Sequence, residues 1–155
     1  DLIEVQGEGS SGEVEPLLIQ QDGTLWLGLA SDHTDRDLEV YSVAASKQAC
    51  AKPMAREVWA FDAVKDRLDE LQLLCEIEEG GEWVTYQEGT LAAIRPLAEL
   101  LSGSGLGGNA AMLCGTLGAR GGVRPAARYR MSLSDPKTGE AIRLDYAVRV
   151  LPIVA

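Results

Sequence analysis

GEVEPLLIQQDGTLWLGLASDHTDRD, residues 12–37, contains two apolar runs separated by a short turn signal. The runs at 13–20 and 24–31 are rich in branched and aromatic side chains, and the Gln-Asp-Gly between them is a common hairpin signal. We therefore expect two antiparallel strands. Such a hairpin brings the end of its second strand back beside the start of its first.

Three carboxylates lie at the expected open end of this hairpin. Glu13 and Glu15 are two positions apart, so on a strand both point to the same face, where like charges repel each other. Asp32 follows the second strand directly. On a solvated surface the pair needs no function, and Asp32 also fits a helix N-cap. If the three converge, they offer the oxygen ligands that hard divalent cations such as Mg²⁺ prefer.

The rest of the chain predicts a mostly β fold with a few short helices. Further strands are expected in two hairpins and one buried apolar run, at residues 71–89, 127–152 and 109–116. Helices are expected from the spacing of apolar residues, at residues 35–46, 63–71 and 90–101. Pro96 should split or kink the last of these helices, and residues 101–108 predict a flexible glycine loop.

Composition limits the classes of partner. The 155 residues suit a single domain, 1–155, and the formal net charge is −10. An acidic chain argues against nucleic acid or an anionic membrane as partner, since both attract Lys and Arg. The apolar runs are too short to span a bilayer. Three widely spaced cysteines and one histidine make no zinc set, and they favour a reducing, cytoplasmic setting.

Taken together, these motifs resemble the fumarylacetoacetate hydrolase superfamily, and they look closest to an uncharacterised bacterial branch of it. In that superfamily a Glu-x-Glu strand precedes a strand that ends in D-x-[ST]-x-R-D, which residues 32–37 match in register. SKQACAKP (46–53) and MLCGTLGARGG (112–122) are similar to its lysine loop and its Gly-Thr strand. The resemblance implies a mixed β-sandwich or β-roll and a homodimer. It also implies that the family's N-terminal region is missing from this chain.

The resemblance assigns a metal and its ligands. Glu13, Glu15 and Asp32 would bind Mg²⁺, or Mn²⁺ or Ca²⁺ in its place. Lys47 would be the active-site lysine that neutralises charge on a substrate oxygen. Lys52 is an alternative, because the loop is one residue shorter than the usual pattern.

Further residues would face the substrate. The resemblance implies that Thr116 meets a substrate carboxylate through its backbone and hydroxyl. The glycines that follow, Gly118, Gly121 and Gly122, either let the backbone approach an anion or simply form a turn. Glu39 is a departure, since the superfamily commonly has Gln at that position.

The function implied is a divalent-metal-dependent enzyme acting on a small anionic 2-oxo acid or β-dicarbonyl compound. The metal would stabilise an enolate during C–C bond hydrolysis, decarboxylation or isomerisation. The superfamily's hydrolases also use a His-x-x-Glu pair upstream of Glu-x-Glu, and this chain has none there. The alternative is therefore a metal-binding β domain without catalytic competence, either a fragment or a binding or regulatory subunit. A third interpretation is an acidic β protein that binds no metal.

His33 is the only histidine of the chain and stands beside Asp32. That position invites a role as a base. We favour a packed, hydrogen-bonded structural histidine, since histidine is often buried without any catalytic role.

Overall fold

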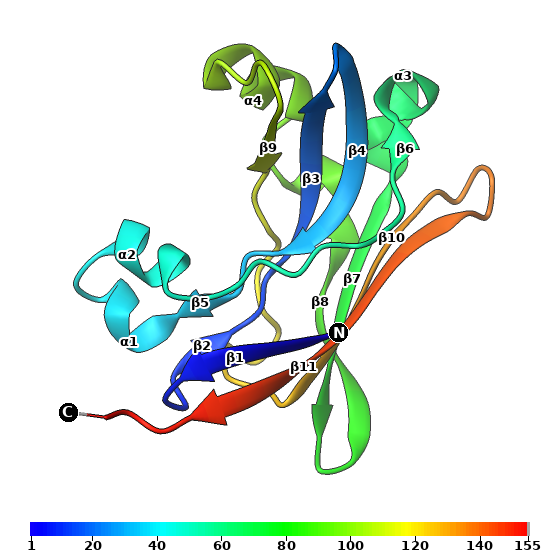
Figure 1. The fold of residues 1–155 in the computed structure, drawn as a ribbon. Helices are drawn as coiled ribbons and strands as arrows, with labels where there is room; N and C mark the ends of the chain where they lie inside the picture. Colours follow the sequence, from blue (N-terminus) through cyan, green and yellow to red (C-terminus); the bar gives the residue numbers. More distant parts are fainter. Residues whose placement is uncertain (155) are drawn as a thin grey trace.

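The computed structural model describes residues 1–154, which fold mostly into strands joined by short helices (Figure 1). The expectation of a mostly β chain is confirmed. The strands are β1 (Leu2–Gln6), β2 (Ser10–Ser11), β3 (Val14–Gln21), β4 (Thr24–Ser31), β5 (Thr34–Asp35), β6 (Trp59–Ala60), β7 (Gln72–Glu79), β8 (Glu82–Thr90), β9 (Ala110–Leu113), β10 (Arg128–Ser134) and β11 (Ala141–Leu151). The helices are α1 (Arg36–Glu39), α2 (Val43–Gln48), α3 (Phe61–Val64) and α4 (Leu97–Ser104), with 3₁₀ turns η1 (Lys65–Glu70) and η2 (Leu91–Ala93).

The predicted hairpin at the start of the chain is confirmed as β3 and β4. The two strands pair antiparallel over their whole length, from Val14 opposite Ser31 to Gln21 opposite Thr24. The turn residues Asp22 and Gly23 have φ angles of 49° and 81°. Two positive φ angles in a two-residue loop match the twist of the flanking strands. This hairpin is the centre of a sheet with the order β6-β4-β3-β9.

A second sheet has the order β1-β11-β10-β7-β8. Its hairpins β7–β8 and β10–β11 are the two predicted at residues 71–89 and 127–152. The sequence did not predict β1, which runs parallel to the last strand with Leu2 opposite Ala147. A short sheet of β2 and β5 links the two larger ones to the α1–α2 segment.

The core lies between the two larger sheets, because each has one apolar face. In β7 the buried residues alternate with partly exposed ones, as expected of a strand with one face on the core. The central side chains from both sheets are fully buried: Leu18, Leu27, Leu29, Leu73, Cys75, Ile77, Tyr129 and Leu133. This packing fixes the ends of β3 and β4 against β10 and β11.

The single helix predicted at residues 35–46 is wrong. Two short helices, α1 and α2, form instead, because Ser42 adopts an extended conformation and its hydroxyl accepts a hydrogen bond from Ala45 N. Tyr41, one of the apolar residues whose spacing predicted that helix, is 87% exposed. The two helices project beside the lower end of β3 and β4 (Figure 1).

The other helix predictions hold in part. The segment predicted at 63–71 is divided between α3 and η1, and Arg67 inside η1 has non-helical backbone angles. Pro96 splits the 90–101 segment as expected, since η2 precedes it and α4 begins directly after it. However, α4 continues through Ser104, so half of the predicted glycine loop is helical. Within residues 1–154, no helix combines the length and the apolar character needed to cross a membrane.

Candidate metal centre

Glu13, Glu15 and Asp32 converge at the end of the β3–β4 hairpin. Glu13 and Glu15 flank Val14 at the start of β3, and Asp32 follows the last residue of β4. The backbone joins the two ends, because Asp32 N donates a hydrogen bond to Glu13 O at 2.9 Å. One carboxylate oxygen from each residue lies within 4.8 Å of the others. The structure thus brings together the three residues expected to bind a metal.

This donor set suits a hard divalent cation. Three carboxylates offer oxygen ligands only, which Mg²⁺, Mn²⁺ and Ca²⁺ accept readily. Glu15 and Asp32 are 5% and 4% exposed, and Glu13 is half-buried. Few solvent molecules can screen the repulsion between them, so an ion of charge +2 would relieve it. The residues therefore fit the metal that the sequence motifs imply.

Glu15 shows the cost of gathering these charges. Burial, together with the nearby charges of Asp32 and Glu13, raises the pKa of Glu15 to about 7. A hydrogen bond from Gly115 N to Glu15 Oε2, 2.7 Å long, acts in the opposite direction.

Both candidate lysines reach the carboxylates. Lys47, on α2, donates a hydrogen bond to Asp32 Oδ2, and its Nζ lies 3.8 Å from Glu13 Oε2. Lys52 Nζ lies 3.0 Å from Asp32 Oδ1 and donates to the carbonyl of His33. Burial alone would raise the pKa of Asp32, but the hydrogen bonds from the two lysines lower it. Of these two lysines, Lys47 is paired with two of the three carboxylates and Lys52 with one.

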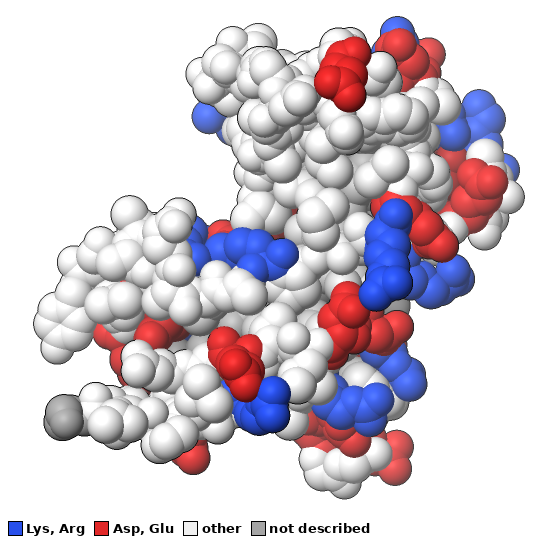
Figure 2. Space-filling view, in the orientation of Figure 1, with Lys and Arg blue, Asp and Glu red and all other residues white. Residues whose placement is uncertain are grey.

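Arg36 is a third cation at the site, and it neutralises the unexpected Glu39. Its Nη1 lies 2.9 Å from Glu39 Oε2, and its Nη2 lies 3.3 Å from Glu13 Oε2. Its Nε donates to Ser11 Oγ at 2.7 Å. Glu39 is thus held by a guanidinium on the same helix. Figure 2 shows Lys and Arg side chains gathered in the hollow beside α2.

Thr116 lies beside Val14, the residue between the two glutamates. Its hydroxyl donates a hydrogen bond to Val14 O at 2.7 Å and accepts one from Gln87 Nε2 at 2.8 Å. Gln87 is 1% exposed, and its Oε1 accepts from Val14 N at 2.9 Å. Sequence reasoning missed Gln87.

Gln87 points inward because β8 contains a bulge. Cys75 pairs with Gln87 and the next residue of β7, Glu76, pairs with Thr85, which leaves Tyr86 as an extra residue. Tyr86 and Gln87 are therefore both buried although they are adjacent. Since polar and apolar residues alternate in an ordinary strand, the sequence carries no signal of this bulge.

His33 is a packed structural histidine in this fold. It is fully buried, with Nδ1 3.0 Å from Tyr146 Oη and Nε2 3.0 Å from Ser10 Oγ. Its ring packs edge-on against the rings of Tyr129 and Tyr146. Burial, together with the charges of Lys52 and Arg36, lowers the pKa of His33 to about 4.

Of the glycines after Thr116, Gly121 and Gly122 lie in a turn and Gly118 does not. Gly121 and Gly122 have φ angles of 77° and 86°, and Gly122 N donates to Ala119 O. The glycine that contacts the carboxylates is Gly115, which the sequence did not single out; its φ is 97°. The Gly-Thr pair directly after an apolar strand is the signal that could have identified it.

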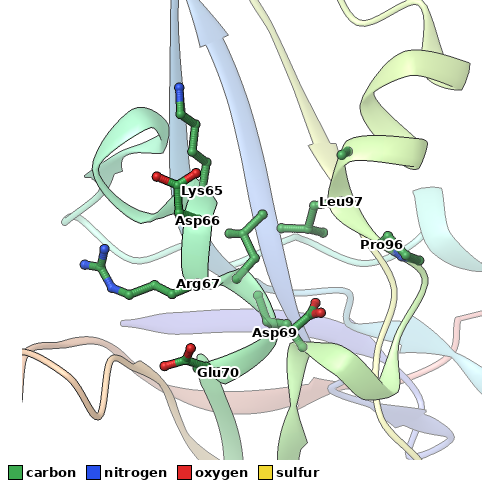
Figure 3. Close-up of a pocket in the computed structure, with 10 residues that line it drawn as sticks. Lys65, Asp66, Arg67, Asp69, Glu70, Pro96 and Leu97 are labelled. Carbon is green, nitrogen blue, oxygen red and sulfur yellow. The ribbon is translucent and has the colours of Figure 1, made fainter.

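A separate pocket of about 330 Å³ lies between η1 and the start of α4 (Figure 3). Charged side chains line it, including Asp66, Asp69 and Glu70. The three converging carboxylates are not among its lining residues, so this pocket is distinct from the candidate metal centre.

The comparisons with known proteins agree with this fold. Residues 1–146 match the model of the family described as "Protein of unknown function (DUF2848)", and the chain belongs to that family. No curated protein matches the chain.

Solved structures give a more distant likeness. A 2-keto-3-deoxyarabinonate dehydratase matches with a TM-score of 0.71 at 16% identity, covering 97% of this chain and 55% of its own. Its counterpart "complexed with magnesium and 2,5-dioxopentanoate" matches with a TM-score of 0.68 at 16% identity, covering 99% and 58%. Cg1458 with inhibitor matches with a TM-score of 0.67 at 13% identity, covering 97% and 63%. The likeness establishes a shared fold, and this chain spans less than two thirds of each structure.

Proposed function

We propose that this chain is a divalent-metal-dependent enzyme of the fumarylacetoacetate hydrolase superfamily, with the sandwich or roll fold of that type. Its substrate is a small anionic 2-oxo acid or β-dicarbonyl compound. The observation that carries this proposal is the convergence of Glu13, Glu15 and Asp32 within 4.8 Å. The dehydratase complexed with magnesium and 2,5-dioxopentanoate, itself a 2-oxo acid, supports both the metal and the class of substrate.

The side chains around the carboxylates support an anionic substrate. A divalent cation, when bound, would supply Lewis-acid stabilisation of negative charge on the substrate's oxygens. Lys47 adds a cation beside Glu13 and Asp32, so its ammonium would hold charge that develops on a substrate oxygen. Lys52 is bound to Asp32 and to the carbonyl of His33, so it would instead orient Asp32.

Thr116 also lies at the candidate metal centre, beside Val14. Its hydroxyl hydrogen is engaged by Val14 O. We therefore assign the contact with the substrate carboxylate to the backbone of Thr116.

The reaction is one that passes through negative charge on the oxo oxygen. C–C bond hydrolysis, decarboxylation and isomerisation all do so. The two dehydratase structures add loss of water from a 2-oxo acid to these outcomes. The homodimer, the single domain and the cytoplasmic location expected from the sequence remain part of the proposal. Sedimentation of the purified chain tests the dimer.

One observation favours the alternative, a metal-binding β domain without catalytic competence. His33 is the only histidine in the sequence, and both of its ring nitrogens face polar partners in the core. A histidine general base must therefore come from outside this sequence. Incubation of metal-loaded protein with a panel of 2-oxo acids and β-dicarbonyl acids separates the two functions. An enzyme consumes at least one compound of the panel, and a binding domain consumes none.

Calorimetric titration of Mg²⁺ and of Mn²⁺ tests the metal site. Wild type should bind one ion, and Glu13→Gln/Glu15→Gln should bind it at least about tenfold more weakly, because two anionic ligands are lost. Glu57→Gln/Glu82→Gln removes the same charge from exposed positions and should bind as wild type does. Equal affinity in wild type and the first double variant would show that the site is assigned wrongly.

A further inference from the structure

Both backbone polar groups of Val14 are hydrogen-bonded to side chains from distant parts of the chain. Its N–H donates to Gln87 Oε1 at 2.9 Å, and its C=O accepts from the Thr116 hydroxyl at 2.7 Å. Both contacts are on the residue that separates Glu13 from Glu15. Any movement of Val14 therefore moves the two carboxylates.

These side chains take over where a strand partner ends. β9 pairs with β3 only from Leu17 to Gln20, and one further backbone bond joins Cys114 N to Pro16 O. Beyond that point the backbone groups of Val14 are satisfied by Gln87 and Thr116 instead of by a strand. A buried backbone group without a partner would cost free energy, so this end of β3 depends on the two side chains.

The hydrogen bonds leave Thr116 little freedom. A hydroxyl has one hydrogen, and that hydrogen is donated to Val14 O. Gln87 Nε2 donates to the Thr116 hydroxyl at 2.8 Å and to Leu117 O at 2.6 Å, which fixes the amide orientation as well. What the Thr116 hydroxyl still offers is an acceptor lone pair, and a substrate carboxylate has no hydrogen to donate to it.

The geometry points to Gln87 and Thr116 as positioning residues that hold Glu13 and Glu15 in place for the metal. This inference rests on the proposed function. It assigns Gln87 a role that the motifs did not suggest, and it moves the Thr116 hydroxyl from substrate contact to support of the metal ligands. Groups that orient metal ligands typically change metal affinity about 10–100-fold when they are lost.

The test is the Mn²⁺ dissociation constant of four variants, measured well below each variant's melting temperature. Thr116→Val keeps the shape of the side chain and loses the hydroxyl, and Gln87→Met keeps its length and loses its hydrogen bonds. Both should raise the dissociation constant about tenfold or more. Thr116→Ser keeps the hydroxyl and should bind as wild type does. Ile142→Val, a buried change on β11 outside this network, should lower stability and leave the dissociation constant unchanged.

Three outcomes are distinguishable. A tenfold loss of Mn²⁺ affinity in Thr116→Val, with wild-type affinity in Thr116→Ser, supports the inference. Lost stability alone would also weaken Mn²⁺ binding in Ile142→Val. Unchanged Mn²⁺ affinity in Thr116→Val and Gln87→Met overturns it while leaving the proposed function intact. Wild type that binds no Mn²⁺ overturns the proposed function and this inference with it.

Discussion

The amide nitrogen of Gly115 lies 2.7 Å from Oε2 of Glu15 and donates a hydrogen bond to it. The two residues are 100 positions apart in the sequence, and they meet because β9 pairs with β3 and delivers the following loop to the start of that strand. Gly115 adopts a φ of 97°, a conformation that residues with a Cβ rarely adopt. The direction in which this N–H group points therefore depends on glycine.

Gly115→Ala should disturb the metal centre through the backbone. No atom within 4 Å would meet the new Cβ, so the expected cost, about 1–2 kcal/mol of unfolding free energy, comes from the positive φ. The strained amide should also turn away from Glu15 and weaken Mn²⁺ binding. Urea unfolding and calorimetry measure the two effects.

Gly118→Ala is the matched control for that variant. Gly118 is exposed, is not among the residues with positive φ, and also has open space at its Cβ. Both of its measurements should equal those of wild type. An equal loss in the two variants would contradict the role given to Gly115.

Divalent ions should raise the melting temperature of wild type. Binding to the folded state alone adds about 2.7 kcal/mol at a free ion concentration of 100 times the dissociation constant. The shift should disappear on adding EDTA and should be absent in Asp32→Asn. A melting curve that ignores millimolar Mg²⁺ and Mn²⁺ would favour the acidic β protein without a metal.

Glu39→Gln should strengthen the binding of an anionic substrate. The change removes a negative charge and frees Arg36 Nη1 from its 2.9 Å ion pair. Since Glu39 is partly exposed, the pair itself should be worth less than about 1 kcal/mol, and the melting temperature should change little. The KM for an anionic substrate should fall several-fold while the Mn²⁺ dissociation constant stays the same. An increased KM would mean that Glu39 itself contacts the substrate.

His33→Phe should destabilise the protein without a direct effect on chemistry. The ring keeps its packing against Tyr129 and Tyr146, but Ser10 and Tyr146 each lose a buried hydrogen-bond partner. We expect a loss of about 1–3 kcal/mol in unfolding free energy. If the variant folds and loses only the turnover rate, with Mn²⁺ binding intact, the structural role is wrong.

The same histidine should make stability depend on pH. Burial lowers the pKa of His33 from 6.5 to about 4, so between these values the unfolded chain binds a proton that the folded chain does not. The contribution of His33 is present above pH 6.5 and is lost as the pH falls towards 4, by at most about 1.4 kcal/mol per pH unit. The free energy of unfolding, measured with urea at pH 7, 5.5 and 4.5, should change less with pH in His33→Phe than in wild type.

Local chemistry made the hairpins predictable. The Asp22–Gly23 turn and the apolar runs beside it lie within one short segment, so the sequence alone predicts both the pairing and the meeting of Glu15 with Asp32. The parallel pairing of β1 with β11 joins the two ends of the described chain, and no local pattern encodes it. The prediction of one helix at 35–46 was wrong because the Ser42 hydroxyl caps a new helix at that point, which the spacing of apolar residues does not reveal.

The candidate site was predictable to the extent that it follows from strand ends. Lys47 and Lys52 were predicted from the resemblance to the superfamily's lysine loop, and the structure brings both to the carboxylate of Asp32. Gln87 and Gly115 depend on how β8 and the loop after β9 meet β3. Such contacts form only after both sheets are in place, which sequence patterns do not describe.

The extra residue at Tyr86 makes β8 a strand with two phases. Before it, Val84 packs against the core; after it, Gln87 is buried, Glu88 is exposed and Gly89 is half-buried. Deleting one residue there would rotate Gln87 into solvent while every amino acid of the metal centre stayed present in the sequence. The length of this strand is therefore as much a part of the site as its composition, and changes in length among relatives should fall in the turn at Gly80–Gly81 rather than between Thr85 and Thr90.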